Sequence, residues 1–163
     1  MKGFNVAIVG ATGLVGREFI KVLLERRFPT SSLQLYASDR SAGRKLFFGH
    51  EEIEVKETTP QSFDHIDIVL FSAGSEVSHY FSPIAAEAGA VVIDNSAAFR
   101  MDTDVPLVVP EVNPEDVRGH KGIIANPNCS TIQMVVALYP FHRLNPIRRI
   151  IVDTYQSVSG TGL

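Results

Sequence analysis

The amino-acid sequence predicts an α/β fold with a doubly wound, mostly parallel sheet. Short runs of β-branched residues alternate with segments of helical periodicity along the chain, which is the pattern of such sheets. Residues 66–72 are almost entirely apolar and suit a strand that is covered on both faces. A glycine-rich turn, Gly10–Gly16, joins the first expected strand to the first expected helix. The 163 residues suffice for one domain, or for one domain and the start of another.

The first half of the chain contains most of the expected strands. These cover residues 5–9, 33–37 and 66–72, with a short extra strand at 53–55. A helix is expected over residues 14–27, because Val15, Phe19 and Val22 recur on one face. Pro29 marks the exit from this helix.

The second half continues the alternation. An apolar helical stripe runs from Val77 to Ala88, with Pro83 inside it and Gly89 as its stop. Pro83 should kink this helix or delay its start. The remaining elements are strands at 91–94 and 123–126, a helix at 131–139 interrupted near Pro140, and a final strand at 149–155.

The chain ends in a glycine-rich stretch, residues 157–163, where a turn leaves the last expected strand. An ordinary domain seldom stops within such a turn, so we expect a truncated second domain. The predicted division is a dinucleotide-binding domain at 1–128 and the start of a catalytic and dimerisation domain at 129–163.

Composition narrows the classes of function. The chain is 45% hydrophobic and 20% charged, which argues against disorder. With 15 Lys and Arg against 18 Asp and Glu, it is not suited to binding nucleic acid. No run approaches the roughly 18 apolar residues of a membrane span. The single cysteine excludes an internal disulfide and favours the cytoplasm, and no zinc-ligand spacing is present.

The turn with Gly10, Gly13 and Gly16 has the chemistry of a phosphate cradle. Glycine permits a tight turn and lets a phosphate approach backbone N–H groups, while the helix N-terminus adds partial positive charge. Its G-x-x-G-x-x-G spacing departs from the commoner G-x-G-x-x-G of Rossmann-like domains. A tight turn without a ligand is the alternative.

The end of the second strand indicates which nucleotide binds. Ser38, Arg40, Ser41 and Arg44 can surround a 2′-phosphate with charge-assisted hydrogen bonds, which favours NADP over NAD. Asp39 either repels that phosphate or pairs with a neighbouring arginine. A solvated polar turn is the alternative interpretation.

A small turn, Ser72-Ala73-Gly74, closes the strand at 66–72. Ligands of doubly wound sheets bind outside the carboxyl ends of strands, so this turn is a candidate lining of the cofactor site. An ordinary turn explains it nearly as well.

The stretch around Cys129 is the most informative. A strand ends before it, and a helix should begin at or just after the cysteine. A helix N-terminus stabilises a thiolate, and its N–H groups can stabilise an oxyanion. Asn128 is a candidate side-chain donor, whereas Ser130 or Thr131 is the expected helix cap. A lone cysteine that fills the core is the alternative.

Two further polar residues follow strand ends. Arg100 can clamp a phosphate or carboxylate through paired N–H donors, and Gln156 can both donate and accept. A solvated arginine and an ordinary glutamine are the simpler interpretations.

Together these motifs resemble the aspartate-semialdehyde dehydrogenase family over nearly the whole chain. The matching segments are Gly10–Gly16, 38–43, 72–74, 94–100, 109–113, 126–131 and 155–160. The cysteine motif, combined with Gln156, Ser159 and Gly160, makes the resemblance specific.

The resemblance implies NADPH-dependent reductive dephosphorylation of 4-phospho-L-aspartate to L-aspartate 4-semialdehyde, a branch-point step toward lysine, methionine and threonine. Cys129 would be the nucleophile that forms an acyl-thioester, Arg100 would hold the phosphate, and Gln156 would position the substrate. The residues implied to contact NADP are Thr12, Gly13, Leu14, Val15, Arg40, Ser41, Ser159 and Gly160.

The family's second half carries a catalytic histidine, a further substrate arginine and most of a homodimer interface. None of these matches a segment of this sequence. We therefore expect the 163-residue chain to bind NADP without turnover, as a non-catalytic module. The alternative enzyme is one like N-acetyl-glutamyl-phosphate reductase, in which an aromatic residue and proline usually follow the cysteine.

Overall fold

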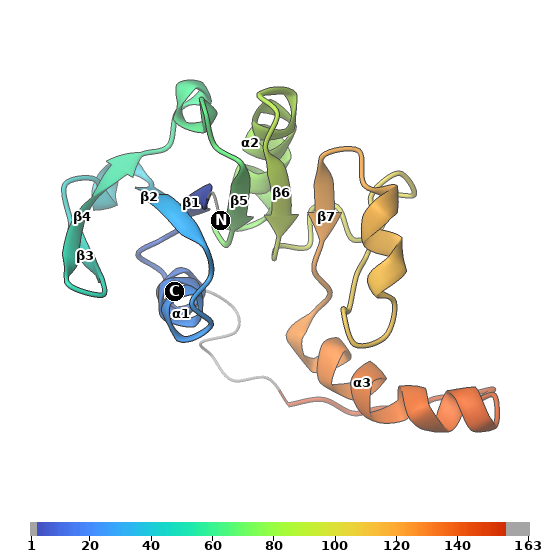
Figure 1. Cartoon of the computed structure of the whole chain (residues 1–163). Helices are drawn as coiled ribbons and strands as arrows, with labels where there is room; N and C mark the ends of the chain where they lie inside the picture. Colours follow the sequence, from blue (N-terminus) through green and yellow to red (C-terminus); the bar gives the residue numbers. More distant parts are fainter. Residues whose placement is uncertain (1–2, 156–163) are drawn as a thin grey trace.

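The structure is a computed structural model that describes residues 3–155, in which seven strands form one sheet. The strands are β1 (Phe4–Val9), β2 (Thr30–Ala37), β3 (Lys45–Phe48), β4 (Glu51–Glu57), β5 (Ile68–Phe71), β6 (Val91–Asp94) and β7 (Ile123–Ala125). Their order is β3-β4-β2-β1-β5-β6-β7, and every pair is parallel except β3 with β4 (Figure 1). The predicted α/β fold is confirmed.

The described residues form three α-helices: α1 (Leu14–Glu25), α2 (Ser75–Glu87) and α3 (Cys129–Leu144). The first two cover the two faces of the sheet. Successive side chains of β1 alternate between two cores. Val6 and Ile8 lie in the same cluster as Ile20 of α1, whereas Ala7 packs in the cluster that contains Ala85 of α2. The first and second helices therefore lie on opposite faces, which is the doubly wound arrangement.

The sheet reverses its direction of growth at β1. The chain passes from β1 to β2 on one side and later returns to place β5 on the other side. In parallel sheets of this kind the crevice for a ligand opens at the carboxyl ends of the strands beside the reversal. The loops that follow β1, β2 and β5 therefore form the first place to look for a site.

The sequence analysis predicted only part of the β-hairpin that β3 and β4 form at the edge of the sheet. The short strand expected at 53–55 is the middle of β4, and its antiparallel partner β3 was not expected at all. The signal is present, because Leu46 and Phe48 alternate with polar or exposed residues before a two-residue connection, Gly49-His50. Gly49 has a φ of 65°, which glycine adopts without a steric penalty.

Two prolines disturb the helices less than expected. Pro83 does not delay α2, which starts at Ser75, and Gly89 follows the helix end with a φ of 95°, as predicted. The predicted interruption near Pro140 is wrong, since α3 runs continuously to Leu144. A proline inside a helix removes one backbone hydrogen bond, but its φ is compatible with the helix.

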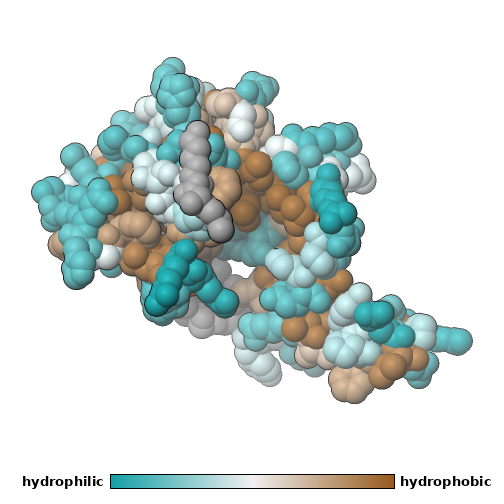
Figure 2. Space-filling view, in the orientation of Figure 1, coloured by the Kyte–Doolittle hydropathy of each residue, from teal (hydrophilic) through white to brown (hydrophobic). Residues whose placement is uncertain are grey.

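The final strand expected at 149–155 is also wrong, because these residues form no strand. A strand requires a neighbour for its N–H and C=O groups, and none lies beside this segment within residues 3–155. Ile151 is 84% exposed, and no residue of α3 is buried. Figure 1 shows α3 extending away from the sheet, and Figure 2 shows apolar residues on its surface.

Within residues 3–155, no helix combines the length and the apolar character needed to cross a bilayer. The division of the chain at residue 128 remains a prediction.

Candidate functional site: a glycine loop, an arginine clamp and an exposed cysteine

The glycine loop after β1 is shaped by close backbone contacts. Gly10 has a φ of 85°, and its N–H donates to the carbonyl oxygen of Tyr36 at 2.9 Å. A Cβ at Gly10 would lie 2.8 Å from the carbonyl carbon of Ser72 and 3.0 Å from the nitrogen of Ala73. Only glycine therefore lets this loop approach the loop that follows β5.

The N-terminus of α1 is open to a ligand. A Cβ at Gly16 would lie 2.7 Å from the Cα of Ala11, so glycine is needed for the helix to pack closely on the loop. Gly13 is the N-cap and provides no side-chain cap. Among the described residues, the N–H groups of Leu14 and Val15 have no acceptor, and the first turn has no acidic residue. Such donors, with the helix dipole, suit an anion.

The small turn after β5 lies against this loop. The Ser72 hydroxyl donates to the carbonyl oxygens of Val9 and Gly10 at 3.3 and 3.4 Å. Gly74 has a φ of 87° and forms the N-cap of α2. Two of the predicted cofactor-binding segments, 10–15 and 72–74, are thus brought together at the point where the sheet reverses.

The third predicted cofactor segment follows β2, the neighbour of β1. Ser38 precedes a 3₁₀ turn, Asp39–Ser41, which is closed by a hydrogen bond of 2.9 Å from the Ser41 nitrogen to the Ser38 carbonyl oxygen. Arg40 is exposed on this turn. In the described part of the chain, Asp39 forms no ion pair with Arg40 or Arg44. The proposed pairing of Asp39 with an arginine is therefore absent.

Cys129 is the first residue of α3 and is exposed, which contradicts the interpretation of a buried filler. The cap of α3 is Asn128, so the expectation that Ser130 or Thr131 caps the helix is wrong. The Asn128 Oδ1 accepts from the backbone nitrogens of Ser130 and Thr131 at 3.0 and 3.4 Å, and from the Ser130 hydroxyl at 2.6 Å. A side chain one residue before a helix reaches the second and third N–H groups, whereas residues inside the first turn do not.

This cap changes which groups are free to hold an oxyanion beside the cysteine. The N–H groups of Ser130 and Thr131 are engaged by Asn128. Within residues 3–155, the Cys129 N–H and the Asn128 Nδ2 have no hydrogen-bond partner. Of these donors on Asn128, Cys129, Ser130 and Thr131, the Cys129 N–H and the Asn128 Nδ2 are the two that the Asn128 cap does not engage.

Arg100 spans the loops that follow β6 and β7. Its Nε donates to the carbonyl oxygen of Asn126 at 3.0 Å, and its Nη2 donates to that of Asn95 at 3.0 Å. Two of the five guanidinium N–H donors are used in this way, which leaves three for a ligand. No carboxylate in the described part of the chain forms an ion pair with Arg100. Within the described residues, an arginine without an ion-pair partner thus lies on the loop after β6 and contacts the loop that leads to Cys129.

Sequence reasoning missed the polar groups that hold these loops. The Asn126 Nδ2 donates to the Asn95 Oδ1 at 2.6 Å, and the carboxylate of Asp94 is fully buried among hydroxyl and N–H donors. A carboxylate at the end of an apolar strand is the signal that points to such a group. The predicted site residues Gln156, Ser159 and Gly160 lie outside the described residues.

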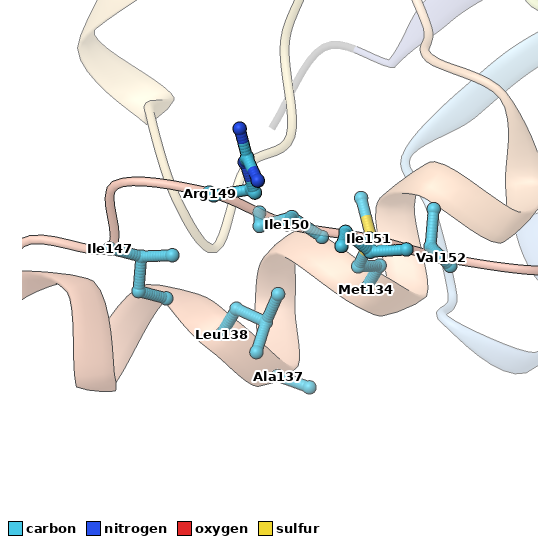
Figure 3. A pocket seen from close by; sticks show the side chains of 8 residues that line it. All are labelled: Met134, Ala137, Leu138, Ile147, Arg149, Ile150, Ile151 and Val152. Carbon is cyan, nitrogen blue, oxygen red and sulfur yellow. The ribbon is translucent and has the colours of Figure 1, made fainter.

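An open pocket of about 450 Å³ lies elsewhere, between α3 and the segment that follows it. Figure 3 shows its lining of Met134, Ala137, Leu138, Ile147, Arg149, Ile150, Ile151 and Val152. Arg149 is the one charged residue in an otherwise apolar lining, and no nucleophile faces it. The described candidate site residues thus lie in the strand-end loops and not in the lining of this pocket.

Comparison with known proteins agrees with this arrangement. Residues 5–120 match the family model described as "Semialdehyde dehydrogenase, NAD binding domain". An aspartate-semialdehyde dehydrogenase of Aquifex aeolicus is 61% identical over 98% of this chain and 48% of its own. The chain thus spans about half the length of the curated relatives it matches.

Solved structures show the same fold. One is aspartate semialdehyde dehydrogenase II of Vibrio cholerae complexed with ASA, with a TM-score of 0.94 and 54% identity over 99% of this chain and 49% of that chain. Another is the aspartate semialdehyde dehydrogenase of Candida albicans with NADP. It has a TM-score of 0.72 and 31% sequence identity, and the match covers 89% of this chain and 48% of that chain. The resemblance predicted from the motifs is confirmed. The family model matches more than half of the residues of this chain. The chain therefore belongs to the semialdehyde dehydrogenase family and contains the family's NAD-binding domain.

Proposed function

We propose that this chain provides the cofactor-binding half and the nucleophile of an aspartate-semialdehyde dehydrogenase. The reaction is reduction of 4-phospho-L-aspartate to L-aspartate 4-semialdehyde with release of phosphate. The observation that carries the proposal is the exposed Cys129 at the start of α3, three residues after the Asn126 carbonyl that fixes Arg100. The relatives at more than 50% identity support the choice of substrate.

We infer NADP as the cofactor. The open N–H groups of α1 fit a pyrophosphate, and the close approach at Gly10 leaves no room for a Cβ beside it. Arg40, exposed and free of ion pairs in the described residues, fits a 2′-phosphate. When bound in its reduced form, NADPH would supply the hydride. The Candida albicans relative, solved with NADP, supports this choice.

The protein's own groups perform the covalent steps. The Cys129 thiolate attacks the acyl carbon of the acyl phosphate, and the Cys129 N–H and Asn128 Nδ2 donate to the oxyanion that forms. The C–O bond to phosphate breaks as the thioester remains, and Arg100 binds the departing phosphate with its free N–H donors. After hydride reaches the thioester carbon, the thiohemiacetal releases the aldehyde and the Cys129 thiolate. Gln156 is proposed to orient the substrate.

The test is phosphate-dependent reduction of NADP by the complete protein, with aspartate semialdehyde as substrate. Cys129→Ala should abolish the acyl-enzyme, seen as a mass increase of the intact protein, because the variant removes the proposed nucleophile, the single cysteine of these 163 residues. The affinity for NADP should stay within about twofold, since Cys129 lies outside the cofactor loops. Equal loss of acylation and NADP binding would mean that the cysteine is structural.

The second candidate is an enzyme like N-acetyl-glutamyl-phosphate reductase. Ser130 and Thr131 follow the cysteine here, in place of an aromatic residue and proline, which disfavours that substrate. Activity with the acetylated semialdehyde alone would reverse this assignment.

For the 163-residue chain by itself we propose NADP binding without turnover. Within residues 3–155 no residue of α3 is buried, so the helix that carries the proposed nucleophile is not packed into either core of the sheet. We further propose a homodimer for the complete enzyme and a reducing cytoplasm as its location, where Cys129 stays a free thiol. Turnover by the purified 163-residue chain would contradict the non-catalytic assignment.

A further inference from the structure

Asp94, the last residue of β6, carries a carboxylate that is completely buried. Its Oδ1 accepts hydrogen bonds from the Ser78 hydroxyl at 2.7 Å and from the Ser96 nitrogen at 3.0 Å. Its Oδ2 accepts from the Ser96 hydroxyl at 2.7 Å. No lysine or arginine pairs with it in the described part of the chain. A buried carboxylate is costly unless such donors surround it, so this group is a built feature of the interior.

The same residue anchors the start of two loops. The Ser96 hydroxyl, held by Asp94, accepts a hydrogen bond from the Ala98 nitrogen at 3.0 Å and so shapes the loop after β6. The Asp94 carbonyl oxygen accepts from the Asn126 nitrogen at 2.8 Å, which fixes the loop after β7. Both loops therefore take their position from one residue at the end of one strand.

Each loop leads to a group of the proposed reaction. The loop after β6 ends at Arg100, and the loop after β7 ends at Cys129. Arg100 joins them by donating to the carbonyl oxygens of Asn95 and Asn126. Hydrogen bonds and the backbone of Asp94 and Asn126 thus connect Ser78 on α2 to the Arg100 guanidinium and to the loop that leads to Cys129.

We propose that Asp94 is a positioning residue, which acts through Ser96 and Asn126 to hold Arg100 and the Cys129 loop at a fixed separation for the phosphate-bearing substrate. This role rests on the proposed function. The separation matters because a displacement of about 1 Å in a reacting geometry can cost on the order of a hundredfold in rate.

The variant that tests this is Ser96→Ala in the complete enzyme. It removes the hydroxyl that bridges Asp94 and Ala98 but deletes no atom of Arg100 or Cys129. The KM for phosphate in the reverse reaction should rise about tenfold or more, because Arg100 loses its fixed position. The Kd for NADP should stay within about twofold, since the cofactor loops follow β1, β2 and β5.

Ser82→Ala is the matched control. Ser82 is fully buried on α2 one turn after Ser78, and its hydroxyl has no hydrogen-bond partner among residues 3–155. The same loss of a buried hydroxyl should leave the KM for phosphate and the Kd for NADP unchanged. Asp94→Asn is the second variant, which keeps the size of the side chain and should raise the KM for phosphate as Ser96→Ala does.

Two results would overturn the proposal. Ser96→Ala with a lower melting temperature but an unchanged KM for phosphate would make the network purely structural. An equal loss of NADP and phosphate affinity would show a general distortion rather than a positioning role. Failure of the unmodified enzyme to show phosphate-dependent turnover would instead contradict the proposed function, and this control is measured before any variant.

Discussion

Two serines on α2 show how local surroundings decide the effect of one side chain. Ser78 and Ser82 are both fully buried, one helical turn apart. The Ser78 hydroxyl donates to the Asp94 carboxylate at 2.7 Å, whereas the Ser82 hydroxyl has no partner in the part of the chain that the structure describes. A hydrogen bond to a charged group stabilises the folded state, while an unpaired buried hydroxyl destabilises it. The same residue type therefore has opposite effects at these two positions.

Replacing each serine by alanine should change stability in opposite directions. Ser82→Ala should raise the free energy of unfolding by about 1 kcal/mol, because an unsatisfied hydroxyl leaves the core. Ser78→Ala should lower it by roughly 2 kcal/mol, because the carboxylate loses a donor. Urea denaturation measures both changes. Destabilisation of similar size in both variants would contradict the hydrogen-bond assignment.

Tyr36 should make the stability of the protein depend on pH in the alkaline range. Burial raises the pKa of its phenol above the usual value of 10.0. The folded state therefore keeps the Tyr36 proton at a pH where the unfolded chain has begun to release it. The contribution of Tyr36 to the free energy of unfolding is complete below the pKa of the unfolded chain and is lost as the pH rises through the pKa of the folded protein. Urea denaturation between about pH 9 and 11 should show a steeper loss of stability for the natural chain than for Tyr36→Phe. Identical pH profiles would exclude this contribution.

At the scale of elements, the sequence predicted those whose pattern is complete within their own residues. The run Val91–Asp94 is observed as β6 without change, and the apolar face of 14–27 is observed as α1. The wrong predictions concern segments whose structure depends on pairing with another part of the protein. Residues 149–155 have the β-branched composition of a strand but nothing to pair with in the described part of the chain. Composition gives a strand's preference, whereas pairing determines whether it forms.

α3 should be the least protected helix of the 163-residue chain. None of its 16 residues is buried, and an isolated helix of this length is marginal even with the Asn128 cap. Hydrogen exchange should therefore be about a hundredfold faster at Gln133 than at Ile20 of α1 or Ala85 of α2, which pack against the sheet. Equal protection in all three helices would mean that α3 has found a partner surface.

At the scale of the whole molecule, every described candidate site residue follows a parallel strand, and the carboxyl ends of parallel strands share one edge. This rule is the reason why the sequence predicts a site at that edge. The loops concerned follow β1, β2, β5, β6 and β7. What the sequence did not reveal is how the loops are tied together. The contacts of Asn95 with Asn126, and of Asp94 with Ser78, join residues 31 and 16 positions apart that no local pattern connects.

The measurement that tests the account most directly is calorimetric titration of the 163-residue chain with NADP and then with NAD. The account predicts binding with a clear preference for NADP, because the glycine loop and the turn with Arg40 both lie on the packed sheet. Arg40→Ala should weaken the binding of NADP about tenfold or more and the binding of NAD much less, because NADP alone loses a charge-assisted contact to its 2′-phosphate. Failure to bind either nucleotide, or an equal loss of both in Arg40→Ala, would contradict it.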